Sequence, residues 1–176
     1  MLSKYYQLIK SRKYIDKCLE TVSFKNNFNK KNINPEISVI IPVFNCENSI
    51  KSSVSSIQNQ RIEEIEIILV NDFSRDNSKK VIENIQKQDS RIVIINNNKN
   101  MGTLYSRNLG AIYANGKYIY CLDNDDMFLN DNIILKIYKI AKKYDYDIIG
   151  FNIINVYTSI RIVINMKKFQ NFYVIE

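Results

Sequence analysis

The sequence has 176 residues, 45% of them hydrophobic, which is enough to bury a core of ordinary size and predicts a single domain. The formal net charge is +7, but residues 1–35 hold eight basic and two acidic side chains and therefore six of the seven net positive charges. A nucleic-acid-binding domain spreads basic side chains over one face of its folded core. The nearly neutral remainder therefore argues against nucleic acid as a partner.

The cysteines and the missing histidines exclude several further classes of protein. Cys18, Cys46 and Cys121 are odd in number and have no framework spacing, which argues against a disulfide-stapled secreted scaffold. The chain has no histidine, so a His-containing zinc site and a Ser-His-Asp arrangement are excluded. The start lacks the apolar stretch of a signal peptide, and no later run resembles an uncharged membrane span. We therefore expect a cytoplasmic chain with reduced thiols.

Residues 1–34 are predicted to form a basic extension that precedes the folded domain. Residues 4–22 carry apolar side chains at helical spacing with lysines between them, which indicates a basic amphipathic helix. The simplest interpretation is a helix packed on the outside of the domain. The alternative is a contact with a membrane surface, on its cytosolic side, through residues 4–22. Residues 25–34 are polar enough for a flexible linker, and the domain is expected to span 35–176.

From Pro35 onward, short β-branched runs alternate with longer stretches of helical pattern. Strands that read as continuous apolar runs are buried on both faces, so the pattern predicts a mainly parallel sheet covered by helices. The expected fold is α/β and doubly wound, with helices on both faces of the sheet. The predicted strands are 37–41, 65–70, 92–95, 118–122 and 148–154, and the predicted helices are 49–59, 76–88, 103–113 and 130–144.

Ligands of doubly wound sheets bind beyond the carboxyl ends of the strands, so the residues after each run are candidates for a site. Here these ends include the acidic loop Asp123-Asn124-Asp125-Asp126. The chain has neither G-x-G-x-x-G nor a Walker sequence, which argues against NAD-type and P-loop chemistry. A hard divalent cation, Mg²⁺ or Mn²⁺, would neutralise both an acidic rim and a diphosphate.

Asp123 and Asp125 are two residues apart at a strand end, so an extended segment turns both carboxylates to the same side. This spacing suits a metal site, but by itself it is a weak signal, and a solvated turn that caps the helix expected near Asn130 is the favoured interpretation of the spacing alone. Arg107 and Arg75 also follow strand ends and are placed to meet a phosphate or a base edge. The alternative for each is a surface salt bridge, which is the favoured interpretation for Arg75.

Four segments, in order, resemble the glycosyltransferases of family 2, which have the GT-A fold. The similarity covers residues 37–126, and three positions depart from the family pattern: Asn71 stands for Asp, Phe73 for Gly and Ser106 for Ala. If the family glycine has a positive φ, Phe73 is expected to require another turn. The segments are Ile37 to Glu47 (ISVIIPVFNCE), Glu66 to Asp76 (EIILVNDFSRD), Asn100 to Gly110 (NMGTLYSRNLG) and Tyr118 to Asp126 (YIYCLDNDD).

The resemblance implies a nucleotide-sugar site that holds a UDP-sugar with Mn²⁺ or Mg²⁺. By this resemblance the Pro42-Val43 backbone and Asp72 would recognise uracil, Arg107 would lie near the base or phosphates, and Asp123 near the ribose and sugar. Asp125, with Asp123 beside it, would be the metal ligand. The donor-binding set implied by the family motifs is Pro42, Val43, Asn45, Glu47, Asp72, Arg107, Asp123 and Asn124.

The family reaction is a metal-assisted displacement with inversion, in which a carboxylate deprotonates the acceptor hydroxyl of a carbohydrate, lipid or protein. Fifty residues follow Asp126, and we expect the domain to be truncated after the metal loop. None of the later carboxylates lies in a recognisable motif, and Asp131 is better explained as a helix-start residue. Three functions stay open: a working sugar transferase, a catalytically incomplete donor-binding module or partner-dependent subunit, and a membrane-surface adaptor. The later carboxylates are Asp131, Asp145, Asp147 and Glu176.

Overall fold

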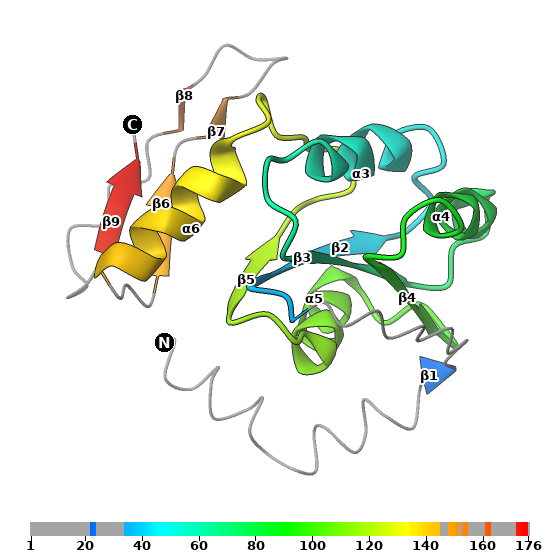
Figure 1. Cartoon of the computed structure of the whole chain (residues 1–176). Helices are drawn as coiled ribbons and strands as arrows, with labels where there is room; N and C mark the ends of the chain where they lie inside the picture. The colour runs from blue at the N-terminus through cyan, green and yellow to red at the C-terminus, as the bar shows by residue number, and fades with distance from the viewer. Residues whose placement is uncertain are drawn as a thin grey trace. The chain divides into compact units, whose positions relative to one another are not determined.

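A computed structural model describes residues 22–23, 34–144, 148–151, 153–154, 161–162 and 172–175. It contains two compact units, residues 1–131 and 132–176, which we describe separately. The first unit is built on a five-stranded sheet with the order β1-β4-β3-β2-β5 (Figure 1). Its strands are β1 (Val22–Ser23), β2 (Ile37–Val43), β3 (Ile65–Asn71), β4 (Ile92–Asn97) and β5 (Tyr118–Cys121).

Strands β2 to β5 are parallel to one another, as the sequence predicts. The chain moves outward from β2 through β3 to β4 and then returns to place β5 on the other side of β2. Because parallel crossovers are right-handed, this reversal puts the last connecting helix on the opposite face of the sheet. Figure 1 shows α3 (Ile50–Gln58) and α4 (Ser78–Gln86) on one face and α5 (Thr103–Tyr113) on the other. The doubly wound α/β prediction is therefore confirmed.

The core lies around the two central strands. All seven residues of β2 and all seven of β3 are buried, which explains why their sequences are continuous apolar runs. On the α5 face, Leu109 packs with Ile40, Ile68 and Ile95 in one cluster. Gly110 lets α5 approach closely, since a Cβ at this position would overlap the side chain of Ile40.

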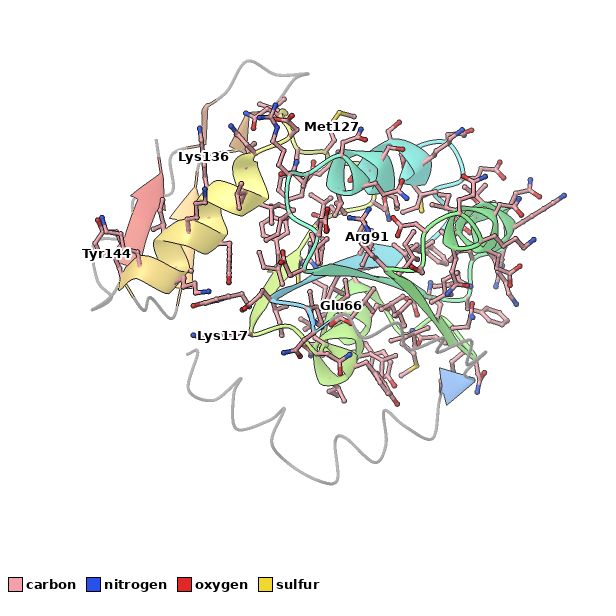
Figure 2. The ribbon with its side chains drawn as sticks, viewed as in Figure 1. Glu66, Arg91, Lys117, Met127, Lys136 and Tyr144 are labelled. Carbon is pink, nitrogen blue, oxygen red and sulfur yellow. The ribbon has the colours of Figure 1, made fainter. Side chains whose placement is uncertain are left out.

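Near the N-terminal ends of the parallel strands, a buried carboxylate ties β5 to the central strands. Glu66, labelled in Figure 2, accepts hydrogen bonds at Oε1 from Ser38 Oγ (2.5 Å) and from the Asn115 N–H (2.5 Å). The Gly116 N–H donates to Ser38 Oγ at 2.8 Å. These bonds fix the turn that leads into β5, and therefore the start of the strand that ends at the acidic loop.

The second unit contains α6 (Ile133–Tyr144) and two small pairs of strands. The predicted strand at 148–154 is wrong as one element, because the structure forms two separate strands there, and neither belongs to the five-stranded sheet. The first strand pairs in parallel with residues 172–175, and the second pairs antiparallel with residues 161–162. Pairing with different distant segments therefore divides the run. The strands are β6 (Ile148–Phe151), β7 (Ile153–Ile154), β8 (Arg161–Ile162) and β9 (Phe172–Ile175).

At the N-terminal side, Val22 belongs to a strand, although the apolar pattern assigns it to the end of a helix. β1 pairs antiparallel with β4, with Val22 opposite Asn97, so the edge of the sheet determines its conformation. The rest of the expected helix and most of the predicted linker lie outside the described residues. Within the described ranges, no helix is both long and apolar enough to cross a membrane.

Candidate functional site

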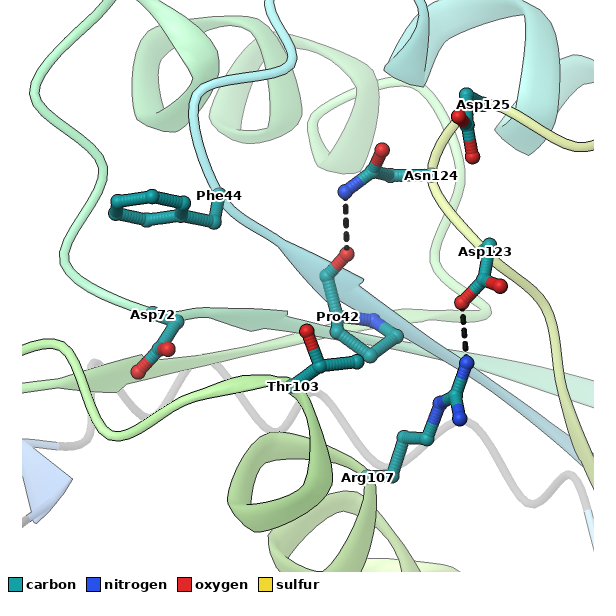
Figure 3. Close-up of a pocket in the computed structure, with 8 residues that line it drawn as sticks. All are labelled: Pro42, Phe44, Asp72, Thr103, Arg107, Asp123, Asn124 and Asp125. Carbon is teal, nitrogen blue, oxygen red and sulfur yellow. Dashed lines mark hydrogen bonds and ion pairs between the residues drawn. The ribbon is translucent and has the colours of Figure 1, made fainter.

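A pocket of about 290 Å³ opens at the carboxyl ends of the parallel strands, where ligands of doubly wound sheets bind (Figure 3). Its walls come from four places in the first unit: the ends of β2 and β3, the start of α5, and the loop after β5. The pocket therefore brings together parts of all four motifs. The lining residues are Pro42, Phe44, Asp72, Thr103, Arg107, Asp123, Asn124 and Asp125.

Asp72 is the buried acid of the pocket, with 2% of its surface exposed. Its Oδ1 accepts hydrogen bonds from Asn97 Nδ2 (2.7 Å) and the Met101 N–H (2.8 Å), and its Oδ2 accepts one from the Gly102 N–H (2.7 Å). Gly102 has φ +87°, a conformation that glycine adopts without strain. Because a carboxylate has about four acceptor positions, Asp72 keeps roughly one for a ligand.

Arg107 and Asp123 meet in the pocket although they come from different elements. Arg107 Nη2 donates a hydrogen bond to Asp123 Oδ1, as the dashed line in Figure 3 shows. The two side chains are 37% and 48% exposed, so both remain accessible to a ligand. Arg107 Nε is buried and has no hydrogen-bond partner among the described residues. Because a guanidinium has five N–H donors and the side chain is partly exposed, Arg107 retains donor capacity for an anion or a base edge.

Asn124 anchors the acidic loop to the rest of the pocket. Its Nδ2 donates to the carbonyl oxygen of Pro42 at 3.1 Å, and its own carbonyl accepts a hydrogen bond from Ser53 Oγ at 2.8 Å. The Asp126 N–H closes a turn by donating to the Asp123 carbonyl at 3.2 Å. The loop is thus fixed to β2 and α3, so that Asp123 and Asp125 face the same pocket.

Negative charge is concentrated in this loop. Burial, followed by repulsion from Asp123 and Asp125, raises the pKa of Asp126. A bound cation would relieve this repulsion, and carboxylate oxygens are the ligands that Mg²⁺ and Mn²⁺ prefer. Within the part of the chain that the structure describes, no three metal-binding side chains converge on one point. A cation held by Asp123 and Asp125 would therefore take its remaining ligands from a bound diphosphate and water.

Three residues of the implied donor-binding set lie outside the pocket lining. The Val43 carbonyl accepts the Asp72 N–H at 2.8 Å, which is a bond between β2 and β3. Asn45 Oδ1 accepts the Arg75 N–H at 2.9 Å, and Glu47 Oε2 accepts the Asn77 N–H at 2.8 Å. These residues join the two loops beside the pocket. Arg75 is exposed in the second of these loops and also lies outside the lining.

The pocket also contains two residues that the predicted set omits. Phe44 lies between Val43 and Asn45 and is 41% exposed, so its ring offers a face for stacking. Thr103 is the first residue of α5. The signal for Phe44 was present in the sequence, because a large aromatic residue directly follows a buried strand at a candidate strand end. For Thr103, the adjacent Asn-x-Gly segment was the available signal.

Phe73 adopts φ +61°, so the expectation that it requires another turn is wrong. It keeps a left-handed conformation that strongly favours glycine and that bulky residues rarely adopt. The neighbouring hydrogen bonds explain why this conformation is kept. The Ser74 N–H donates to Asn71 Oδ1 at 3.1 Å, the Asp72 N–H donates to the Val43 carbonyl, and the Asp72 carboxylate accepts the Met101 N–H. The geometry around Asp72 is thereby retained despite the substitution.

This fold, with an acidic loop after the fourth parallel strand, defines the class of GT-A glycosyltransferases. Solved structures of that class superpose on about two thirds of the chain. TarS of S. aureus in complex with UDP covers 67% of this chain and 35% of its own, with a TM-score of 0.62 and 20% identity. The Pyrobaculum calidifontis mannosyltransferase PcManGT in complex with GDP-Man and Mn²⁺ covers 66% of this chain and 35% of its own, with a TM-score of 0.62 and 16% identity. These similarities concern the fold.

The chain belongs to glycosyl transferase family 2, whose model matches residues 38–173. It is 39% identical over 97 residues to the GalNAc(5)-diNAcBac-PP-undecaprenol beta-1,3-glucosyltransferase of Campylobacter jejuni, a match of 54% of this chain and 31% of that protein. It is 33% identical over 119 residues to glycosyltransferase GlyG of Streptococcus pneumoniae, a match of 68% of this chain and 39% of that protein. The matched segment is thus well under half of either relative's length.

Proposed function

We propose that this chain binds a nucleoside-diphosphate sugar, with UDP as the nucleotide, and transfers the sugar to an acceptor hydroxyl with inversion at the anomeric carbon. The observation that carries the proposal is the convergence of Asp72, Arg107 and the acidic loop in one pocket at the strand ends. An acceptor carboxylate, an arginine with a free donor and a pair of aspartates match the base, the phosphates and a bridging cation, respectively.

The choice of uracil rests on the acceptor character of the buried end of the pocket. Asp72 presents a carboxylate, which pairs with an N–H donor on a base edge. Uracil carries such a donor at N3, as guanine does at N1, whereas the corresponding ring nitrogens of cytosine and adenine are acceptors. Phe44 offers an aromatic face beside it. The UDP complex of TarS, a protein of the same fold, is consistent with this choice.

The residues present fit a divalent cation, which Asp125 would hold with help from Asp123. When bound, Mn²⁺ or Mg²⁺ would supply charge neutralisation for the leaving diphosphate. The chain's own groups would act around it. Arg107 would orient the nucleotide through its guanidinium, and Asn124 would keep the loop against β2 through its bond to Pro42. The manganese complex of PcManGT supports the use of a divalent metal in this fold.

A second candidate function is a donor-binding module that does not turn over. One observation favours it: Asp131, the first carboxylate after the acidic loop, forms an ion pair with Arg61 at 2.7 Å. The Arg61 N–H also donates to the Asp131 carbonyl at 2.7 Å. Asp131 is thereby paired with Arg61 at the end of the first unit, before α6 begins at Ile133, and this pairing argues against Asp131 as the acceptor base.

The acceptor follows from the class of reaction. A sugar donor of this kind requires a hydroxyl nucleophile, and we propose a carbohydrate, lipid or protein hydroxyl as its source. The Campylobacter jejuni relative is named for a saccharide linked to PP-undecaprenol, which favours a polyprenol-linked saccharide as the first acceptor to test.

Calorimetric titration with UDP in the presence and absence of Mn²⁺ tests donor binding. We expect saturable binding that weakens when Mn²⁺ is removed, and an Asp125→Asn variant should lose this metal dependence. Asp126→Asn is the matched control, because Asp126 is the neighbouring carboxylate outside the pocket lining. Absence of UDP binding at millimolar concentration would overturn the proposal. Sugar transfer or slow donor hydrolysis separates the transferase from the binding module.

A further inference from the structure

Two loops beside the pocket are joined by reciprocal hydrogen bonds. The first loop follows β2, and the second follows β3 and leads into α4. Side chains of each loop accept backbone N–H groups of the other, an arrangement that we call the loop clasp. Its bonds are Asn45 N–H to Ser74 Oγ (3.3 Å), Arg75 N–H to Asn45 Oδ1 (2.9 Å), Cys46 N–H to Ser78 Oγ (2.8 Å), Glu47 N–H to Asp76 Oδ2 (3.1 Å) and Asn77 N–H to Glu47 Oε2 (2.8 Å).

The clasp satisfies backbone groups that the loops cannot pair within themselves. The first N–H groups of a helix have no partner inside the helix. At α4, the Asn77 N–H is accepted by Glu47 from the other loop, and the Ser78 N–H by Asp76 Oδ1 at 2.9 Å. Burial opposes ionisation of Asp76, but hydrogen bonds from Ser78 and the Glu47 N–H lower the pKa of Asp76. Glu47 thus caps a helix that belongs to a different βα unit.

The clasp adjoins the two pocket residues that would contact a nucleobase. Phe44 immediately precedes Asn45, and Asp72 lies two residues before Ser74. Phe73, between Asp72 and Ser74 in the chain, has φ +61°, a conformation that costs a bulky residue about 1–2 kcal/mol. Such a conformation persists only where the surroundings fix it. On the C-terminal side of Phe73, the bonds from Asn45 N–H to Ser74 Oγ and from Arg75 N–H to Asn45 Oδ1 belong to the clasp, whereas the Ser74 N–H bonds to Asn71.

The geometry points to Asn45, Glu47 and Asp76 as positioning residues, which fix Phe44 and Asp72 relative to each other without touching the donor. This inference rests on the proposed function, since it assigns a role in donor affinity. The family motif implies that Asn45 and Glu47 contact the donor directly. We assign them an indirect role instead. The position of a stacking ring and a base-reading carboxylate then depends on a clasp outside the pocket.

Glu47 allows a test that separates positioning from ligand contact. Glu47→Gln keeps an oxygen that can accept the Asn77 N–H, whereas Glu47→Ala removes it. We expect Glu47→Ala to weaken UDP binding in Mn²⁺ about tenfold and Glu47→Gln to recover affinity to within about twofold of the wild type. Equal losses in both variants would show that the charge itself is required and would overturn the inference. Unchanged binding in Glu47→Ala would overturn it as well.

A second carboxylate provides the control for a general loss of stability. Asp89 accepts hydrogen bonds from Gln58 Nε2 (2.9 Å) and the Arg91 N–H (3.0 Å) and lies in the α4–β4 turn, at the opposite edge of the sheet from the pocket. Asp89→Asn should lower stability while leaving the dissociation constant for UDP within about twofold of the wild-type value. A tenfold loss of UDP affinity in this control would show that destabilisation alone explains the Glu47→Ala result, and would overturn the inference.

Amide hydrogen exchange measures the clasp without any nucleotide. In Glu47→Ala the Asn77 N–H should exchange faster than in the wild type, while the N–H groups of β3 should be unaffected. Protection of Asn77 that is unchanged in Glu47→Ala would overturn the clasp even if UDP binds. If the wild type binds no UDP but Asn77 loses protection in the variant, the proposed function falls and the clasp stands as a structural device. The two failures are therefore distinguishable.

Discussion

Arg107 donates a hydrogen bond to Asp123 in the pocket, so one carboxylate of the acidic loop is neutralised by α5 in the absence of a cation. Arg107 thus has two expected partners, Asp123 and the nucleotide, and it competes with a metal for Asp123. The pairing also reduces the repulsion within the loop. Its removal should have opposite effects on binding of the metal alone and on binding of UDP.

In Arg107→Ala, we expect Mn²⁺ alone to bind about two- to fivefold more tightly, because Asp123 is released and its screened ion pair is worth only about 0.5–1 kcal/mol. UDP should bind about tenfold more weakly, because a charge-assisted hydrogen bond is lost. Calorimetry with Mn²⁺ and then with UDP measures both constants. Arg107→Lys is the control that keeps the charge. Weaker Mn²⁺ binding in Arg107→Ala would contradict competition for Asp123.

Asp126→Asn should stabilise the protein slightly at pH 7 when no metal is present. Burial and the charges of Asp123 and Asp125 raise the pKa of Asp126, so its ionised form opposes folding at every pH above that pKa. The effect should be about a few tenths of a kcal/mol, because solvent screens an exposed side chain. Urea unfolding at pH 7 and pH 3 measures it.

The sign of this effect follows from linkage. Below the pKa of the unfolded chain, Asp126 is protonated in both states, so the gain should vanish at pH 3 and appear as the pH rises through the raised pKa of the folded state. Lower stability of Asp126→Asn at pH 7 would contradict the repulsion. Exposed Glu63, changed to Gln, is the control for loss of an acidic charge elsewhere.

Replacing Phe73 should reverse the usual order of alanine and glycine. At ordinary positions glycine is about 0.5–1 kcal/mol less favourable than alanine because of its greater freedom in the unfolded chain. At φ +61°, a Cβ costs about 1–2 kcal/mol, so Phe73→Gly should be more stable than Phe73→Ala. Both variants lose the same ring, which cancels its packing contribution from the comparison. Chemical denaturation gives the two free energies of unfolding.

Lys87 provides the matched pair, since it is exposed and has φ −61°. There, Lys87→Ala should be more stable than Lys87→Gly. If Phe73→Ala were also the more stable of its pair, residue 73 would not hold the left-handed conformation in solution.

Asp89→Asn should lower the free energy of unfolding by about 1–2 kcal/mol at neutral pH. Burial opposes its ionisation, but hydrogen bonds from the side chains of Arg91 and Gln58 outweigh burial and lower the pKa of Asp89 from 3.8 to about 2. A lowered pKa stabilises the fold above the unfolded pKa and loses this effect as the pH falls through the folded pKa. The difference between the two proteins should therefore be smaller at pH 3 than at pH 7. A difference that does not change with pH would contradict an ionic contribution.

The four parallel strands and the helices between them could be predicted from the sequence. β2 and β3 are buried along their whole length, so burial alone requires continuous apolar residues there. Six of the nine residues predicted to bind the donor or metal also line one pocket, because parallel strands deliver their carboxyl ends to the same edge of the sheet. These residues are Pro42, Asp72, Arg107, Asp123, Asn124 and Asp125.

The remaining features depend on contacts between distant parts of the chain. The run at 148–154 looks like one strand, but its halves pair with different partners, and Val22 follows a helical pattern until β4 provides an edge. The hydrogen-bond partners of Glu47 lie 29 and 30 residues away, so its motif could suggest a site but not which group it contacts.

The sequence by itself determined the fold class, the family and the strand ends at which a ligand binds, because strand burial and the family motifs are local patterns of residues. Only the tertiary structure decided that Arg107 pairs with Asp123, that Asn45 and Glu47 join two loops, and that Phe73 keeps a positive φ. Each of these depends on hydrogen-bond partners brought together by folding, and a one-dimensional pattern does not contain their geometry.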